Sequence, residues 1–158
     1  MKAEGQTHVY GGKKDYEMPR EVEASEIPAI LEEYRNAAQC AKDAGFDGVE
    51  IHGANGIIII IIIIIIIIII IIIIIIEGYF LDIFLQSCTN IRTDEYGGSK
   101  ENRFRLWREV LNTVCGVFPS QNVGIRVSPN GAFNGMGSDD NMETFNYVFQ
   151  ELESYKLA

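Results

Sequence analysis

The chain has 158 residues, with 22 acidic and 13 basic side chains and a formal net charge of -9. This length is enough for one domain with a hydrophobic core. The shortage of Lys and Arg argues against a nucleic-acid partner, because phosphate binding needs clustered basic residues.

The three cysteines, Cys40, Cys88 and Cys115, are odd in number and widely spaced. This pattern fits neither a disulfide framework nor a metal site, so it favours a reducing compartment and predicts no bound metal. The N-terminus lacks the charged-then-apolar pattern of a secretory signal. We therefore expect a cytoplasmic protein.

The first elements precede a long homopolymer. Residues 1–23 contain paired glycines and lysines without apolar periodicity, which predicts an irregular segment. Apolar residues then recur at helical spacing from Ser25, the predicted N-cap, to a stop at Gly45. A short apolar run at residues 46–52 predicts a buried strand that ends at His52.

Residues 57–76 form a run of twenty isoleucines, which is a low-complexity insertion. As a helix it would span about 30 Å, the length of a transmembrane segment. Its flanks lack a cluster of Lys and Arg, and a pure homopolymer favours an expanded codon repeat or an error in the sequence. We therefore expect no membrane partner. The alternative is a non-catalytic, membrane-associated remnant that crosses the bilayer once through residues 57–76.

The chain after the insertion alternates helices and strands. The predicted elements are a short helical turn at 79–85, a polar loop at 89–99, a helix that starts at Ser99 and ends before Pro119, a strand at 123–129, a glycine-rich loop at 130–138 and a helix at 141–157. The predicted buried face of the middle helix consists of Phe104, Leu106, Trp107, Val110, Leu111, Val114 and Val117.

The order of these elements predicts an α/β fold with parallel strands. In such folds the chemistry lies in loops just past the carboxyl ends of the strands. Both predicted strands lead into polar side chains there, His52 with Asn55 and Arg126 with Asn130. Two strands cannot close a barrel, so we expect an arc of a larger structure.

Four motifs carry a resemblance to a known family. They are Phe-Asp-Gly-Val-Glu-Ile-His-Gly-Ala-Asn-Gly at 46–56, Asn-Ile-Arg-Thr-Asp-Glu-Tyr-Gly-Gly-Ser at 90–99, Glu-Asn-Arg at 101–103 and Val-Gly-Ile-Arg-Val-Ser-Pro at 123–129. In this order they resemble the old yellow enzyme family of FMN-dependent flavoproteins. The resemblance implies an NAD(P)H oxidoreductase, an ene-reductase that uses NADPH or NADH to reduce the C=C bond of α,β-unsaturated carbonyl compounds.

The same resemblance implies a TIM (β/α)8 barrel. Residues 1–158 would then be a fragment of one FMN-binding domain, with about two to three βα units of the eight and an interruption at 57–76. Because the fragment would lack other flavin-binding strands, we expect the isolated chain to bind FMN weakly or not at all.

The resemblance assigns His52 and Asn55 to substrate binding, as the pair that grips the carbonyl oxygen. Hydride arriving at the β-carbon pushes negative charge onto that oxygen, and two fixed donors stabilise it as an oxyanion hole does. The alternative is that His52 only caps its strand in a polar network.

In the family, a tyrosine directly follows the Asn-Gly of this motif and donates a proton to the α-carbon. Ile57 occupies that position here, and the sequence motif of the family resumes at Gly78. The resemblance therefore assigns Tyr79 as the displaced catalytic proton donor, a role for which a phenol is a suitable acid. The alternative is an ordinary buried aromatic.

Arg126 matches an arginine that lies against the pyrimidine end of FMN, where a cation stabilises the reduced flavin. A buried arginine needs an anionic partner, and a salt bridge to Glu50 is the alternative. Phe133 matches a pocket-lining aromatic of the family, but packing under its loop is the other reading. Five further residues fit loop scaffolding better than catalysis: Arg92, Asp94, Gly97, Gly98 and Arg103.

Overall fold

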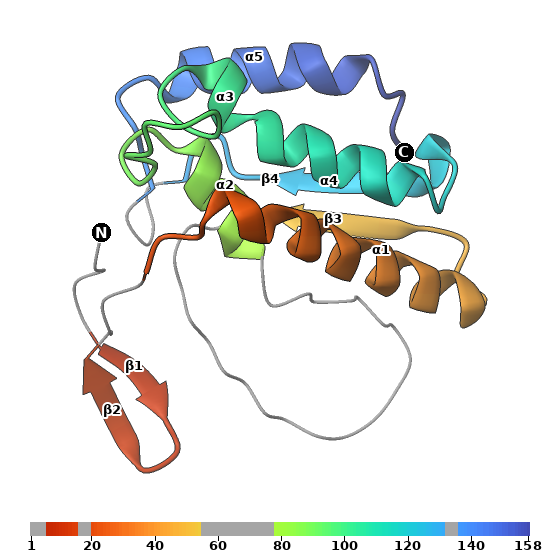
Figure 1. Ribbon diagram of the computed structural model, residues 1–158, viewed down its shortest axis with the longest axis horizontal. Coiled ribbons are helices and arrows are strands. Elements are labelled where there is room, and N and C mark those ends of the chain that lie inside the picture. The colour runs from red at the N-terminus through yellow and green to blue at the C-terminus, as the bar shows by residue number, and fades with distance from the viewer. Residues whose placement is uncertain (1–5, 16–19, 55–77, 132–135) are drawn as a thin grey trace.

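The computed structural model describes residues 6–15, 20–54, 78–131 and 136–158. Its described strands form two separate two-stranded sheets (Figure 1). Strands β1 (Gln6–Val9) and β2 (Gly12–Asp15) pair antiparallel. Strands β3 (Val49–Gly53) and β4 (Val123–Val127) pair parallel and carry the polar strand ends that the sequence singled out.

The helices follow the predicted order. They are the short 3-10 turn η1 (Ala24–Glu26), α1 (Ile27–Asp43), α2 (Gly78–Leu85), α3 (Lys100–Arg103), α4 (Arg105–Cys115), the 3-10 turn η2 (Ser120–Asn122) and α5 (Asn141–Glu153). Ser99 caps α3 as predicted, because its side chain accepts a hydrogen bond from the backbone N–H of Asn102. In the sequence, helices α2 to α4 come between β3 and β4, and they form the crossover connection that two parallel strands need.

The start of the first helix differs from the prediction. Ser25 lies inside η1, and the capping box is formed by Glu23 and Glu26 instead. Arg20 donates two hydrogen bonds to the Glu26 carboxylate, at 2.6 and 2.7 Å. These bonds, with the backbone N–H of Glu23, lower the pKa of Glu26 to about 2. The start of the helix is therefore capped by a charged network, whereas Ser25 was the predicted N-cap.

The predicted irregular segment at residues 1–23 is also wrong in part, because it contains the β1–β2 hairpin. Gly11 has φ +100° and Gly12 has φ +135°, which are conformations that glycine adopts without steric cost. Strand β2 is exposed along its whole length, as is Tyr10 in the turn. The two strands pair through the backbone, and the sequence of the exposed strand β2 lacks the apolar alternation that would have predicted it.

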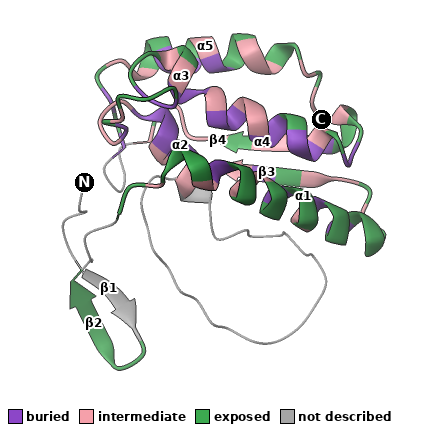
Figure 2. Ribbon diagram, viewed as in Figure 1, coloured by how far each residue is buried: buried purple, intermediate pink, exposed green. Residues whose placement is uncertain are grey.

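The core lies between the β3–β4 sheet and helices α1 and α4, which pack against each other. Figure 2 shows the buried residues concentrated on α4 and α2, with exposed residues along the outer side of α1. Every residue of the predicted buried face of α4 and its flanks is buried: Phe104, Leu106, Trp107, Val110, Leu111, Val114 and Val117. Burying each large apolar side chain contributes about 1.5–3 kcal/mol.

The strands alternate between two faces. Ile51 and Val123 belong to the buried core, and Val49, Ile125 and Val127 pack against it. The intervening side chains therefore lie on the opposite face of the sheet, which we call the open face and define by Glu50, His52 and Arg126. In a closed barrel the face away from the helices is the interior.

Candidate active site

His52 and Arg126 are direct partners in the parallel register of β3 and β4. Each lies one residue before the end of its strand, and the common register places both side chains on the open face. The structure thus brings together two predicted site residues that are 74 positions apart in the sequence, from 52 to 126. They meet at the carboxyl edge of the strands, where parallel α/β folds carry their chemistry.

Arg126 forms an ion pair with Glu50 on the neighbouring strand. Its Nε lies 2.9 Å from Glu50 Oε1, and its second guanidinium nitrogen lies 3.5 Å from Oε2. The prediction that Arg126 is buried is wrong, because 57% of its side chain is exposed. More than half of the guanidinium side chain is exposed while Glu50 orients it, so among the described residues it is accessible to an anionic ligand.

His52 is half-buried, and its environment disfavours the imidazolium. Burial lowers its pKa most, the nearby charge of Arg126 lowers it further, and Glu50 raises it. The net direction is below the ordinary value of 6.5. This lowered pKa favours the neutral imidazole, which has one ring N–H to donate.

The other predicted site residues lie in or beside gaps in the description. Asn55 and Phe133 are outside the described residues, as is the poly-isoleucine insertion at 57–76. Tyr79 is the second residue of α2, which confirms the predicted helical turn there, although its side chain is not described. Helix α2 packs against β3, so the element that carries Tyr79 lies beside the strand that carries His52.

A buried polar cluster, which sequence reasoning did not assign, holds the far end of α2. Ser138 donates from Oγ to Gln86 Oε1 at 2.8 Å, and Ser87 donates to Asp140 Oδ1 at 2.5 Å. Gln86 is 2% exposed and Ser138 is 7% exposed, so both are paired inside the protein. The available signal was the spacing of Asp82, a polar residue in an otherwise apolar helix, and Gln86, which follows the end of that helix by one residue.

Arg103 extends this cluster to α3 and α5, as its predicted scaffolding role requires. Its side chain is 3% exposed and donates to Asp140 Oδ2 at 2.7 Å and to Thr144 Oγ1 at 3.0 Å. Burial alone would raise the pKa of Asp140, but hydrogen bonds from Ser87 and Arg103 outweigh burial and lower it. The loop after β4 is thereby attached to α2 and α3 through charged groups.

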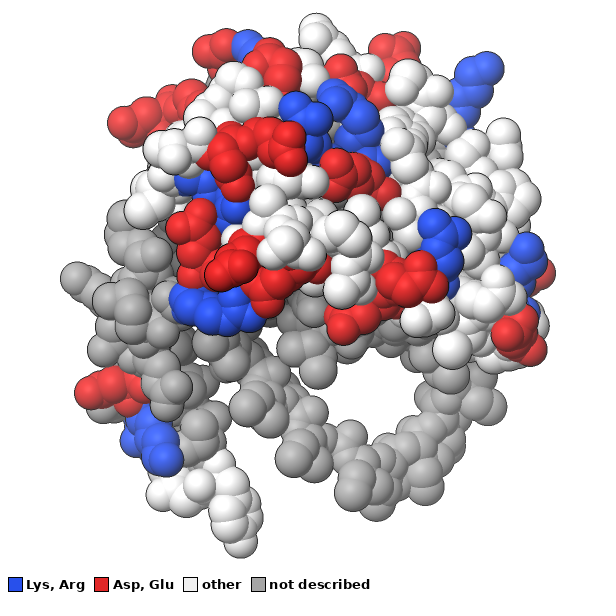
Figure 3. Space-filling model, in the orientation of Figure 1, with Lys and Arg blue, Asp and Glu red and all other residues white. Residues whose placement is uncertain are grey.

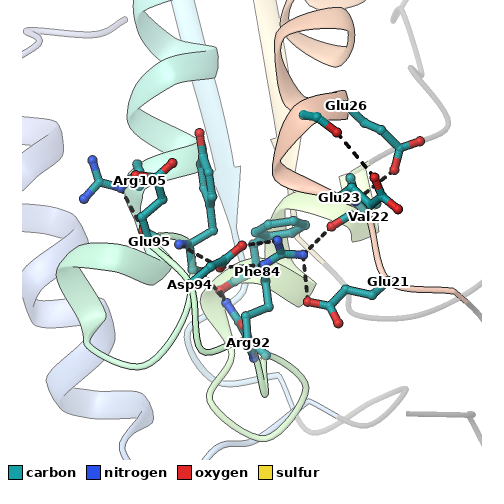
Figure 4. A network of polar contacts seen from close by, with 12 residues as sticks. Glu21, Val22, Glu23, Glu26, Phe84, Arg92, Asp94, Glu95 and Arg105 are labelled. Carbon is teal, nitrogen blue, oxygen red and sulfur yellow. Dashed lines mark hydrogen bonds and ion pairs between the residues drawn. The ribbon is translucent and has the colours of Figure 1, made fainter.

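Arg92 plays the same scaffolding part on the other side of α2 (Figure 4). It donates from Nε to Asp94 at 2.9 Å and from a terminal nitrogen to the Val22 carbonyl at 2.5 Å. Its guanidinium carbon lies 5.4 Å from the centre of the Phe84 ring, within cation-π range. The arginine therefore ties the segment before α1 and the 89–99 loop to α2.

The turn at Gly97 and Gly98 in this loop requires glycine for steric and backbone reasons. A Cβ on Gly97 would lie 2.2 Å from the Arg92 carbonyl oxygen, and Gly98 has φ +78°. Only glycine fits both conditions, which supports the interpretation of residues 97 and 98 as scaffolding. The motif Tyr-Gly-Gly therefore shapes the loop that carries Arg92.

Other kinds of site find no support among the described parts of the chain. No group of His, Cys, Asp and Glu in those parts could hold a metal ion, and all three cysteines are free thiols. On the face in Figure 3, acidic and basic side chains are interspersed, without a continuous basic surface. No helix within the described ranges is long and apolar enough to cross a membrane. The proposed span at 57–76 lies outside those ranges.

Comparison with known proteins identifies the family. The model of the NADH:flavin oxidoreductase / NADH oxidase family matches residues 2–60 and 70–157. The chain therefore belongs to this family, which confirms the resemblance to old yellow enzymes.

Two curated relatives illustrate the likeness. A probable flavin mononucleotide-dependent alkene reductase of Leishmania infantum is 36% identical over 94% of this chain and 34% of its own length. The 12-oxophytodienoate reductase 1 of Oryza sativa subsp. japonica is 38% identical over 89% of this chain and 31% of its own length. The chain thus spans about a third of the length of these relatives.

Solved structures confirm the predicted fold class. The old yellow enzyme homologue of Zymomonas mobilis matches 100% of this chain with a TM-score of 0.82 and 35% identity, over 38% of its own length. Morphinone reductase in complex with tetrahydroNAD matches 99% of this chain with a TM-score of 0.79 and 37% identity, over 39% of its own length. The described strands and helices are therefore part of a TIM barrel of the old yellow enzyme type.

Proposed function

We propose that the chain supplies part of the active site of an FMN-dependent NAD(P)H oxidoreductase that reduces the C=C bond of α,β-unsaturated carbonyl compounds. The observation that carries this proposal is the direct register pairing of His52 with Arg126 on the open face. One side chain is a neutral hydrogen-bond donor and the other an accessible cation. Membership of a flavin oxidoreductase family supports reading this pair as a site.

The open face fits FMN at Arg126. An exposed guanidinium can meet the pyrimidine edge of a flavin, which becomes anionic on reduction. Bound FMN, reduced by NADPH or NADH, would supply the hydride. The related structure of morphinone reductase with tetrahydroNAD supports a nicotinamide as its source.

His52 would bind the substrate carbonyl. A neutral imidazole N–H aimed at the carbonyl oxygen stabilises the negative charge that develops there as hydride reaches the β-carbon. Asn55, three residues further along the chain, would donate the second hydrogen bond. The lowered pKa of His52 favours the neutral imidazole that this role needs.

Tyr79 would complete the reaction by donating its phenolic proton to the α-carbon. Its place at the start of α2 supports this role, because α2 packs beside β3. Phe133, in the loop after β4, would line the substrate pocket and set the shape of the alkene that fits.

Product analysis tests the proposal. The chain is incubated without oxygen with millimolar FMN, NADPH and 2-cyclohexenone, and the saturated ketone is measured by gas chromatography. Millimolar FMN compensates for the weak binding that we expect of the isolated chain, so product should exceed that of a protein-free mixture, and His52→Ala should lose about 100- to 1,000-fold in kcat/KM.

The matched control is His8→Ala, which makes the same substitution in β1, a strand that carries none of the proposed site residues. This variant should keep the wild-type rate. Equal product with and without protein, or equal losses in both variants, would contradict the proposed function.

A further inference from the structure

The single tryptophan of the chain, Trp107, contacts both elements that carry the proposed chemistry. It lies in α4 and is fully buried at 0% exposure. Its indole Nε1 donates a hydrogen bond of 2.7 Å to the carbonyl oxygen of Leu81, in α2. Leu81 is two residues after Tyr79, so the bond fixes the first turns of the helix that carries the proposed proton donor.

The same ring reaches the end of β3. A Cβ on Gly53 would lie 2.4 Å from Trp107 Cη2 and 2.8 Å from Cζ2. Real Cβ atoms do not approach so closely, so the indole occupies space that any larger residue at position 53 would need. Gly53 directly follows His52, which places the ring against the backbone beside the proposed carbonyl-binding side chain.

We propose that Trp107 is a positioning residue that fixes α2 against the end of β3 and thereby sets Tyr79 relative to His52. The effect on Tyr79 and His52 as parts of one site rests on the proposed function. An indole is a rigid plate with two rotatable side-chain bonds, and here one edge bonds to α2 while the six-membered ring abuts β3. It therefore joins the two halves of a site that the insertion at 57–76 separates in the sequence.

The contact can be removed without unfolding α2, because other groups hold the helix. Gln86 bonds to Ser138 near its end, and Arg92 covers Phe84. The indole N–H is thus expected to control how the first turn of α2 sits, while the helix itself persists.

The first test replaces the indole N–H alone. Because the chain has one tryptophan, growth with β-(3-benzothienyl)alanine exchanges only residue 107 and keeps the shape of the ring while removing the donor. Backbone amide shifts of the full chain are then compared by NMR. We expect shifts at residues 79–83 and unchanged signals in α1 and α5. Unchanged signals in α2, or equal changes across α1 and α5, would overturn the proposal.

The second test measures turnover of 2-cyclohexenone with FMN and NADPH. The benzothienyl protein should lose about 10- to 100-fold in kcat with little change in KM, since about 1 Å of misplacement can cost a hundredfold. In a Tyr79→Phe background the same exchange should have no further effect, whereas a general packing defect would lower both backgrounds equally and refute the positioning role.

A wild-type chain without turnover would count against the proposed function. The NMR comparison would still decide whether Trp107 sets the position of α2. Trp107→Phe provides a second variant, which also lacks the donor but leaves space beside Gly53. It should shift the α2 signals and those of β3, and a spectrum altered in neither element would again overturn the proposal.

Discussion

On one face of the β3–β4 sheet, Ile51 and Val123 are buried under α1 and α4, whereas on the other face His52 is half-buried and Arg126 is exposed. The two faces alternate residue by residue along the same strands. The helix-covered face contributes apolar burial, and the open face contributes donors and charge. Fold stability and the proposed activity therefore depend on different faces of the sheet. Substitutions on the helix-covered face should lower stability, and substitutions on the open face should lower the proposed activity.

The largest loss of stability should come from the helix-covered face. Trp107→Ala removes a fully buried indole and leaves Leu81 without its hydrogen bond. We expect the free energy of unfolding to fall by about 3–5 kcal/mol in urea denaturation. Phe149→Ala is the control, because this aromatic on α5 is partly exposed and should cost far less. Equal losses in the two variants would mean that the core does not lie where we place it.

Arg103→Ala should have the next largest effect. It removes two hydrogen bonds from a nearly buried guanidinium, although Asp140 keeps partial contact with water. We expect a loss of about 1.5–3 kcal/mol, the range for hydrogen bonds to charged groups. Arg35→Ala, in an exposed ion pair with Glu32, should change stability by only about 0.3–0.5 kcal/mol. Chemical denaturation of both variants side by side would show whether burial sets the difference.

Substitutions on the open face should be nearly silent in the same measurement. His52→Ala and Arg126→Met remove accessible or half-buried polar groups, and the Arg126–Glu50 pair is exposed on both sides. We expect changes of about 1 kcal/mol or less, while the proposed activity is lost. A destabilisation as large as that of Trp107→Ala would show that the open face carries fold stability and would remove the contrast.

The smallest effect should be a change in acid sensitivity at the start of α1. Hydrogen bonds from Arg20 and Glu23 lower the Glu26 pKa from 4.5 to about 2. Since the folded pKa is the lower one, the contribution is present above the unfolded value and is lost as pH falls from about 4.5 toward 2. Glu26→Gln should flatten this part of the stability profile, measured by thermal unfolding between pH 5 and pH 2.5. Parallel profiles for both proteins would contradict this assignment.

Helical periodicity and parallel α/β alternation were enough to predict α1, α4, α5 and the β3–β4 pair, because each buries an apolar stripe. The β1–β2 hairpin was missed because its second strand, β2, is exposed and has no such stripe. Likewise, the capping box of Glu23 and Glu26 is joined by Arg20, which bonds to the Glu26 carboxylate and lies outside the usual capping pattern. Local sequence patterns therefore predict the elements that bury apolar residues. They do not predict features, such as this cap, that depend on polar contacts outside the pattern.

The candidate site shows the same division. The motif order placed His52 and Arg126 at neighbouring strand ends, but only the register shows that they are direct partners. Arg126 is exposed because it lies on the open face of the sheet, away from the helices, and the strand motif alone did not predict which face it would occupy. The contacts of Trp107 with Gly53 and Leu81 join residues far apart in the chain, and a helical stripe identifies such a residue only as core.

The central claim, that the open face of β3 and β4 is the flavin side of the site, is tested most directly by NMR titration of the labelled chain with FMN. Millimolar FMN suits the weak binding that we expect. The account predicts signal changes concentrated at His52 and Arg126 and reduced by Arg126→Met, with Ala38 and Val110 on the helix-covered side unchanged. Changes centred on α1 and α4, or none at His52 and Arg126, would contradict it.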